Sequence, residues 1–118
     1  MVLVYGIPNC DIIRKTLDWL RINDVTFEFH DYKKEGITPE KLRSWIKQVG
    51  LEKVLNKKST TWRGLNPAQQ DSIGDPEAAI VLLRENTSMI RRPIIESGHK
   101  VLVTGFNEKE FNEKIKTL

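Results

Sequence analysis

The sequence predicts an α/β fold with a mixed β-sheet, and three observations support this prediction. The chain opens with a strand pattern, a helix pattern and a second strand pattern over residues 2–30. Residues 38–91 show almost only helical spacing of apolar residues, and two short strands and a last helix follow. Two strands joined by one helix form a right-handed parallel pair, whereas the later strands are typical of a hairpin. The expected order is therefore β-α-β, a helical insertion, and β-β-α.

The first strand is predicted by the β-branched and aromatic run from Val2 to Tyr5. Gly6 and Pro8 then mark a tight loop. Apolar residues at helical spacing follow the loop, and they predict an amphipathic helix over about residues 9–22. Open α/β sheets place their ligands at loops of this kind, so the loop is a candidate functional region.

The only cysteine, Cys10, lies at the start of this helix. Unpaired backbone N–H groups and the positive end of the helix dipole favour a thiolate there, and the thiolate is the nucleophilic form of cysteine. Arg14 adds a positive charge one turn further along the same face. The alternative is an inert packing residue, because free cysteine is among the most buried residue types. Position alone leaves both interpretations open.

The second strand is predicted over residues 25–30, where apolar and polar residues alternate. Residues 31–38 are polar and contain Gly36, which predicts a turn segment. Thr38 and Pro39 are of the types preferred at the N-cap and the first position of a helix. Apolar residues at helical spacing continue this helix to Gly50, which is expected to end it.

The rest of the insertion is predicted to be helical, with one undecided segment. Residues 51–55 are expected to form a short helical turn, and residues 57–65 are a loop or an irregular helix because they have no clean period. Asn66-Pro67 and Asp75-Pro76 repeat the pattern of an N-cap followed by proline. The second of these opens a helix over residues 77–86, which has few helix breakers and a continuous apolar face.

A hairpin and a last helix complete the pattern. Residues 93–96 and 101–103 are two short strands separated by a turn at Ser97-Gly98. Pro93 stands at the start of a strand, where its missing N–H costs least. Asn107 is the expected N-cap of a helix whose apolar positions are Phe111, Ile115 and Leu118.

Length and composition limit the functional classes. The chain has 118 residues, which is one domain of ordinary size. No apolar run approaches the roughly 20 residues that span a bilayer, and the pattern of a signal peptide is absent, so we expect a cytoplasmic protein without membrane contact. The net charge of +3 comes from basic residues spread along the chain, and we expect no direct binding to nucleic acid. A single cysteine allows no internal disulfide.

Metal binding is not expected, because one cysteine and two scattered histidines do not approach the spacing of metal ligands. His30 ends a strand and His99 lies in a hairpin turn, so neither is favoured as a base for Cys10. The tryptophans are expected in the core rather than on a surface that stacks nucleic-acid bases.

Several segments taken together resemble a known family. Tyr5-Gly6-Ile7-Pro8-Asn9-Cys10 is followed by Arg14-Lys15 and, far downstream, by Arg91-Arg92-Pro93-Ile94-Ile95. Further matches are residues 27–32, Thr61-Trp62-Arg63-Gly64-Leu65 and Gly105-Phe106. In this order and spacing the chain resembles the glutaredoxin-dependent arsenate reductase family (ArsC), and most closely its YffB-type branch. It is also similar to the Spx-type regulators, which share the fold.

The resemblance implies one thioredoxin-like domain over residues 1–118, with a core of residues 1–37 and 92–118 and a helical insertion at residues 38–91. It also implies a cis Arg92-Pro93 bond that faces Cys10. The Arg92 guanidinium would then favour the thiolate and hold an oxyanion or a carboxylate. Cys10 and Arg92 are therefore the expected catalytic residues. The expected substrate-binding residues are Asn9, Arg14, Lys58 and Pro93.

Departures from the family pattern count against arsenate reduction, which needs several cations around the cysteine. Arg92 matches one oxyanion arginine, but Val103 is apolar at about the position where another is expected. In the middle segment only a lysine, Lys58, could replace the family's arginine, and it lacks bidentate geometry. Gly6 also replaces a histidine that is common just before the cysteine loop.

The part of the family's function that the resemblance still implies for this chain is its thiol chemistry. Residue 13 is Ile13, where Spx-type regulators commonly carry the second cysteine of a Cys-x-x-Cys switch, so a dithiol cycle is excluded. The implied function is a monothiol reductase or transferase in which Cys10 is the nucleophile and glutathione the co-substrate. We expect a monomer with no tightly bound cofactor, and glutaredoxin is a further candidate partner. The alternative is a non-enzymatic, Spx-like regulator that binds RNA polymerase or another protein through its helical insertion.

Overall fold

The chain folds into two units, and the sequence of the second is inserted between two segments of the first. The computed structural model describes all residues, 1–118. One unit consists of Met1–Glu35 and Arg92–Leu118, and the other of Gly36–Arg91. The first contains a β-sheet and its covering helices, and the second is entirely helical apart from one isolated bridge. This division falls just before the border that the resemblance places after residue 37.

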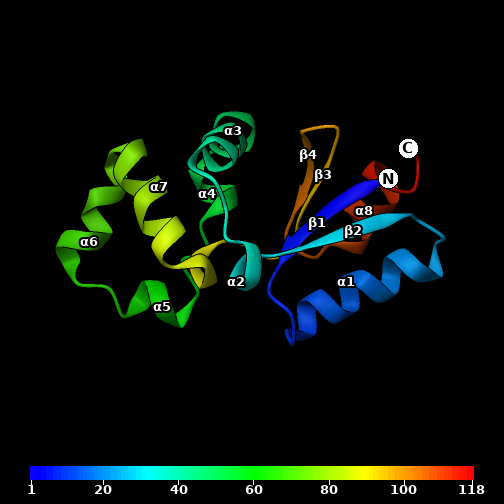
Figure 1. Cartoon of the computed structure of the whole chain (residues 1–118), viewed down its shortest axis with the longest axis horizontal. Helices are drawn as coiled ribbons and strands as arrows, with labels where there is room; N and C mark the ends of the chain where they lie inside the picture. Colours follow the sequence, from blue (N-terminus) through cyan, green and yellow to red (C-terminus); the bar gives the residue numbers. More distant parts are fainter. The chain divides into compact units, whose positions relative to one another are not determined.

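The sheet unit contains four strands, which are β1 (Val2–Gly6), β2 (Phe27–Asp31), β3 (Ile94–Ser97) and β4 (Lys100–Thr104). Their order across the sheet is β2-β1-β3-β4 (Figure 1). β1 pairs parallel with β2 and antiparallel with β3, and β3 pairs antiparallel with β4. The predicted mixed sheet with a parallel pair and a hairpin is therefore confirmed.

Two helices, α1 (Asp11–Ile22) and α8 (Glu108–Lys114), pack on one face of this sheet. Because side chains alternate along a strand, every second residue of β1 points to that face. The Asn107 side chain accepts the Glu110 N–H at 3.0 Å, as the predicted N-cap requires. Leu118 is exposed, so its predicted place on the apolar face of α8 is wrong. The core on this face consists of Val2, Val4, Leu20, Ile95, Val103, Phe111 and Ile115.

The segment after β2 is not the predicted polar turn but a short helix, α2 (Tyr32–Glu35). The Asp31 side chain accepts the backbone N–H groups of Lys33 and Lys34, at 2.8 and 3.4 Å. Tyr32 is buried, which anchors the first turn of α2 in the sheet unit. Local capping and the burial of one aromatic residue therefore override the polar composition of this segment.

The helical unit begins with α3 (Pro39–Val49) and α4 (Leu51–Val54). It continues through α5 (Thr60–Arg63), α6 (Pro67–Asp71), the 3₁₀ turn η1 (Ser72–Gly74), α7 (Pro76–Glu85) and the 3₁₀ turn η2 (Thr87–Met89). The predicted helices of the insertion are thus present. The undecided segment contains α5, because the Ser59 hydroxyl caps the Trp62 N–H at 3.1 Å.

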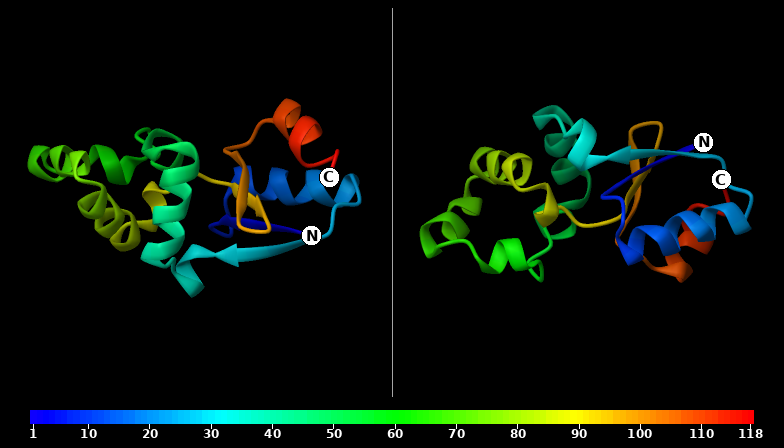
Figure 2. Two further views of the ribbon diagram at one scale, coloured as in Figure 1. Left: turned by 90° about the horizontal axis from the view of Figure 1, so that it is seen from above. Right: turned by 60° about the horizontal axis from the view of Figure 1, so that its bottom comes forward.

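A helix cap and an ion pair between helices stabilise this unit. The Thr38 hydroxyl accepts the Lys41 N–H at 3.2 Å at the start of α3. Arg43 of α3 pairs with Glu77 of α7 through contacts of 2.6 and 3.2 Å. Figure 2 shows the chain of this unit running in an arc through α5 and α6 before α7 returns it toward α3. None of the helices has both the length and the apolar character needed to cross a membrane.

Candidate functional site

Cys10 occupies the N-cap position of α1 in an extended conformation, with φ −114° and ψ 130°. Its carbonyl oxygen accepts the Arg14 N–H at 2.9 Å, which is the first hydrogen bond of the helix. Its side chain makes no capping hydrogen bond and is half-buried. Asn9, just before it, has a φ of 58°, a left-handed conformation that asparagine tolerates better than most residues. Cys10 is therefore the residue directly before the unsatisfied N–H groups that begin α1.

Gly6 brings β1 and α1 into close contact just before this loop. A Cβ atom at Gly6 would lie 2.3 Å from Cδ1 and 2.9 Å from Cγ1 of Ile13, so a larger residue does not fit without movement. Ile13 itself is buried at 2% exposure, three residues after Cys10. The absence of a side chain at Gly6 thus has a packing consequence, because it leaves space for an isoleucine in the first turn of α1.

The Arg92-Pro93 peptide bond is cis, as the resemblance implies. Tyr5 of β1 pairs with Ile94 of β3, so Pro93 comes directly before the residue that faces the end of β1. The Pro93 carbonyl accepts the Gly105 N–H at 2.7 Å, which fixes this segment on its other side. The segment Arg92-Pro93 therefore enters the sheet at the edge where the chain leaves β1 toward Cys10.

A buried polar cluster lies on the face of the sheet opposite α1 and α8. The Tyr5 hydroxyl donates to Oε1 of Glu96 at 2.7 Å, and Glu96 is fully buried at 0% exposure. The Tyr5 ring lies 4.7 Å from the His30 ring and 6.3 Å from the Tyr32 ring, measured between centroids. Sequence reasoning missed this cluster. Its one available signal was a carboxylate, Glu96, directly after two isoleucines of a predicted strand.

Burial raises the pKa of both tyrosines in this cluster. For Tyr5 the pKa lies well above 10, first because of burial and then because its hydroxyl donates to the Glu96 carboxylate. Burial also raises the pKa of Tyr32 well above 10, and the positive charge of Arg92 opposes that rise. The Arg92 charge therefore acts electrostatically on the Tyr32 hydroxyl, at the end of the sheet unit where β2 passes into α2.

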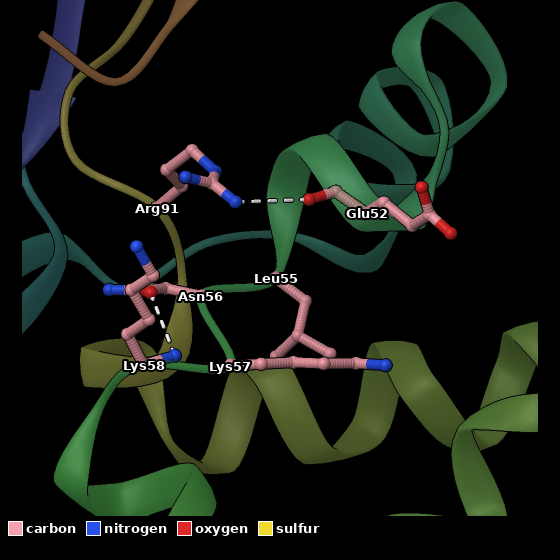
Figure 3. A pocket seen from close by; sticks show the side chains of 6 residues that line it. All are labelled: Glu52, Leu55, Asn56, Lys57, Lys58 and Arg91. Atoms are coloured by element: carbon pink, nitrogen blue, oxygen red, sulfur yellow. Dashed lines mark hydrogen bonds between the residues drawn. The ribbon is translucent and has the colours of Figure 1, made fainter.

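The other expected substrate-binding residues are placed as follows. Arg14 forms an ion pair with Asp11 on the exposed surface of α1, so an acidic neighbour already partly compensates its charge. Lys58 belongs to the helical unit, in the segment between α4 and α5 (Figure 3).

The two histidines lie in different parts of the sheet unit. His30 lies 3.8 Å from the Glu35 carboxylate, measured from Nδ1 to Oε2, and His99 has a φ of 67° in the hairpin turn. No group of three or more His, Cys, Asp or Glu side chains is arranged to hold a metal ion.

Comparison with known proteins assigns this arrangement to a family. The model of the ArsC family matches residues 5–114, which include the Cys10 loop, the helical insertion and the Arg92-Pro93 segment. The chain belongs to the ArsC family. The sequence-based resemblance is thereby confirmed.

Relatives of this ArsC-family chain include both uncharacterised proteins and regulators. An uncharacterised protein from Haemophilus influenzae is 41% identical over 111 residues, which cover 94% of this chain and 96% of the relative. The global transcriptional regulator Spx from Lactiplantibacillus plantarum is 30% identical over 125 residues, which cover 100% of this chain and 92% of the regulator. The relatives of this chain therefore include a protein named as a transcriptional regulator.

Solved structures confirm the fold of this ArsC-family chain. The YFFB (PA3664) protein is 37% identical and superposes with a TM-score of 0.90, covering 98% of this chain and 99% of that protein. An arsenate reductase from Vibrio cholerae is 20% identical and has a TM-score of 0.77, covering 97% of each chain, which supports the fold alone. The fold is thus thioredoxin-like, with a helical insertion between its β-α-β and β-β-α halves.

Proposed function

We propose that this ArsC-family protein is a monothiol oxidoreductase that uses Cys10 as nucleophile and glutathione as the resolving thiol. The observation that carries the proposal is the position of the only cysteine, half-buried at the N-cap of the 12-residue helix α1, with its sulfur outside any capping hydrogen bond. Helix N-termini favour the thiolate over the thiol, and the thiolate attacks disulfides.

The proposed cycle consists of two thiol–disulfide exchanges. In the first, the Cys10 thiolate attacks the glutathione sulfur of a mixed disulfide, forms a Cys10–glutathione disulfide, and releases the substrate thiolate, which takes up a proton. In the second, the thiolate of a second glutathione attacks the glutathione sulfur bound to Cys10. This step releases oxidised glutathione and restores the Cys10 thiolate. Overall, one mixed disulfide and one reduced glutathione become one protein thiol and one oxidised glutathione.

Arg92 is proposed to stabilise the negative charge in this cycle. The cis Arg92-Pro93 segment lies at the sheet edge where the chain leaves β1 toward Cys10, and this arrangement supports the proposal. A guanidinium remains charged at every relevant pH and can donate two parallel hydrogen bonds to a carboxylate. Arg92 would therefore favour both the Cys10 thiolate and the binding of an anionic thiol. Arsenate reduction is not part of the proposal, because Val103 is apolar where the family pattern has a cation.

The test is the rate at which iodoacetamide alkylates Cys10 at pH 7, compared with the rate for free cysteine, because the thiolate is the reactive form. The wild type should react faster than free cysteine. The rate should fall in Arg92→Ala and stay nearly unchanged in Arg92→Lys, which keeps the charge. A wild-type rate no higher than that of free cysteine, and unchanged in Arg92→Ala, would contradict the proposal. Mass spectrometry after incubation with oxidised glutathione should also show one adduct, absent in Cys10→Ser.

A second candidate function is a non-enzymatic regulator that binds RNA polymerase. The full-length similarity to the Spx regulator from Lactiplantibacillus plantarum favours it. Ile13 weighs against a redox switch of the Cys-x-x-Cys type in this chain. Capture of purified RNA polymerase by the wild type and equally by Cys10→Ser, together with no glutathione adduct, would favour this second function over catalysis.

A further inference from the structure

The residue directly after Cys10 carries a negative charge. Asp11 is the first residue of α1, and Cys10 is its N-cap. The Cα atoms of the two residues are about 3.8 Å apart, as in any trans peptide, and the Asp11 side chain is 85% exposed. A carboxylate in the first turn interacts favourably with the positive end of the helix dipole. Asp11 therefore offsets part of the positive potential that this helix end offers to an anionic substrate.

The nearest cation on α1 is already engaged by Asp11. The Arg14 guanidinium forms an ion pair with the Asp11 carboxylate, through Nη2 and Oδ1, across three residues of the helix. The Arg14 side chain is 62% exposed, so water surrounds the pair. Together the two side chains carry no net charge. The helix start therefore differs from the arrangement that the resemblance implies, in which Arg14 serves as a binding cation.

The other charges of α1 lie further from Cys10. Lys15 is five residues after Cys10, about 7.5 Å along the helix axis. Asp18 pairs with Arg21 at 3.3 Å, also across three residues, so this pair repeats the one at the helix start. Asp18 lies two turns after Asp11 on the same face, about 12 Å along the axis from Cys10, which exceeds the Debye length of about 10 Å at 0.1 M ionic strength. Asp18 is thus a matched carboxylate whose charge is largely screened at Cys10.

We propose that Asp11 is a specificity-determining residue, which directs Cys10 toward uncharged sulfur electrophiles and away from oxyanions. The inference rests on the proposed function, because it concerns what the Cys10 thiolate attacks. In a disulfide the attacked sulfur carries no charge, and the carboxylates of glutathione lie several bonds away from it. In an oxyanion such as arsenate, charged oxygens surround the attacked atom itself. These oxygens would have to approach the Asp11 carboxylate before the thiolate could react.

Coulomb's law gives the size of the expected effect. For a carboxylate about 7 Å from the reacting atom in water, the repulsion lowers the local concentration of a monoanion about 2.7-fold without salt. The factor for a dianion is the square, about sevenfold, because the repulsion doubles. Screening at 0.1 M ionic strength reduces the monoanion factor to about 1.5- to 2-fold. An uncharged electrophile is not affected, so Asp11 discriminates by the charge at the reacting atom rather than by size.

The test compares neutral iodoacetamide with anionic iodoacetate, two alkylating reagents of similar size, on the full chain at pH 7 and 0.1 M ionic strength. Both react with the Cys10 thiolate, so the ratio of the iodoacetate rate to the iodoacetamide rate does not depend on the fraction of thiol that is ionised. This ratio should rise about 1.5- to 2-fold in Asp11→Asn and keep its wild-type value in Asp11→Glu, which retains the charge. Asp18→Asn, the matched control, should change the ratio by at most about 1.2-fold. In 1 M NaCl, where the Debye length is about 3 Å, the difference between Asp11→Asn and the wild type should disappear.

The outcomes separate this inference from the monothiol cycle. An unchanged ratio in Asp11→Asn, or an equal rise in Asp11→Asn and Asp18→Asn, would overturn the role of Asp11. A rise that persists in 1 M NaCl would also overturn it, because a change of shape rather than of charge would then be the cause. A wild-type iodoacetamide rate above that of free cysteine, with an unchanged ratio in Asp11→Asn, refutes only this inference. A wild-type rate no higher than that of free cysteine, with a raised ratio in Asp11→Asn, refutes the monothiol cycle and leaves the charge effect of Asp11 in place.

Discussion

Replacing Gly6 by alanine should destabilise the protein by about 2 kcal/mol, because the new methyl group overpacks the contact between β1 and α1. The added Cβ would lie 2.3 Å from Cδ1 and 2.9 Å from Cγ1 of Ile13, whereas carbon atoms pack best at about 3.5–4.0 Å. Ile13 is buried, so its side chain has little room to turn away. Extra methyl groups in a well-packed core typically cost about 1–3 kcal/mol.

The measurement is urea-induced unfolding of four proteins: the wild type, Gly6→Ala, Ile13→Val and the double variant. Ile13→Val alone should cost about 0.5–1.5 kcal/mol, because it removes one buried methyl group. Since that methyl group is the Cδ1 atom nearest to the new Cβ, Gly6→Ala should cost less in the Ile13→Val background. We expect a coupling free energy of at least about 0.5 kcal/mol.

Gly74 provides the matched control, because a Cβ at Gly74 would meet no atom within 4 Å. Gly74→Ala should therefore leave the free energy of unfolding nearly unchanged. Two results would refute the packing argument. One is a Gly6→Ala cost no larger than that of Gly74→Ala, and the other is an equal Gly6→Ala cost with isoleucine and with valine at position 13.

Two further predictions concern a titration and a helix cap. An unfolded tyrosine loses its proton near pH 10, whereas burial and the Glu96 carboxylate raise the pKa of folded Tyr5 well above that value, so the folded state holds the proton more tightly. Above pH 10 the free energy of unfolding should therefore fall by about 1.4 kcal/mol per pH unit because of Tyr5. Urea unfolding of Tyr5→Phe should show a shallower fall of this free energy with pH. Thr38→Ala removes the hydroxyl that caps the Lys41 N–H, and it should lower the unfolding free energy by about 1 kcal/mol, with Thr38→Ser close to the wild type.

The fold could be predicted wherever its signals are local in the sequence. Thr38-Pro39 and Asn66-Pro67 begin helices because the capping side chain and the pre-set proline φ act within a few residues. The β-branched and aromatic run of β1 and the helical spacing in α1 likewise depend only on neighbours. The helix α2 could not be predicted in this way, because its first residue, Tyr32, is held by burial against parts of the chain that the local pattern does not contain.

The candidate site shows the same division between local and tertiary information. Cys10 could be placed at a helix start because Gly6, Pro8 and the apolar spacing all lie within about one strand and one helix of it. The Tyr5–Glu96 hydrogen bond depends on the register of β1 against β3, which are separated by the entire insertion. The bridge between Leu55 and Ile90 likewise joins residues that lie far apart in the sequence. Neither contact leaves a periodic pattern in the sequence.

The position that excludes a dithiol switch is the same position that packs α1 onto the sheet. Ile13 lies three residues after Cys10, where a resolving cysteine would stand, and its side chain fills the space that Gly6 leaves on β1. A cysteine at position 13 would remove buried carbon atoms and leave a cavity beside the start of α1, at a cost in stability. Packing in this chain therefore favours a side chain larger than cysteine where a two-cysteine mechanism requires a thiol. If Cys10 is redox-active, the thiol that resolves it must come from another molecule.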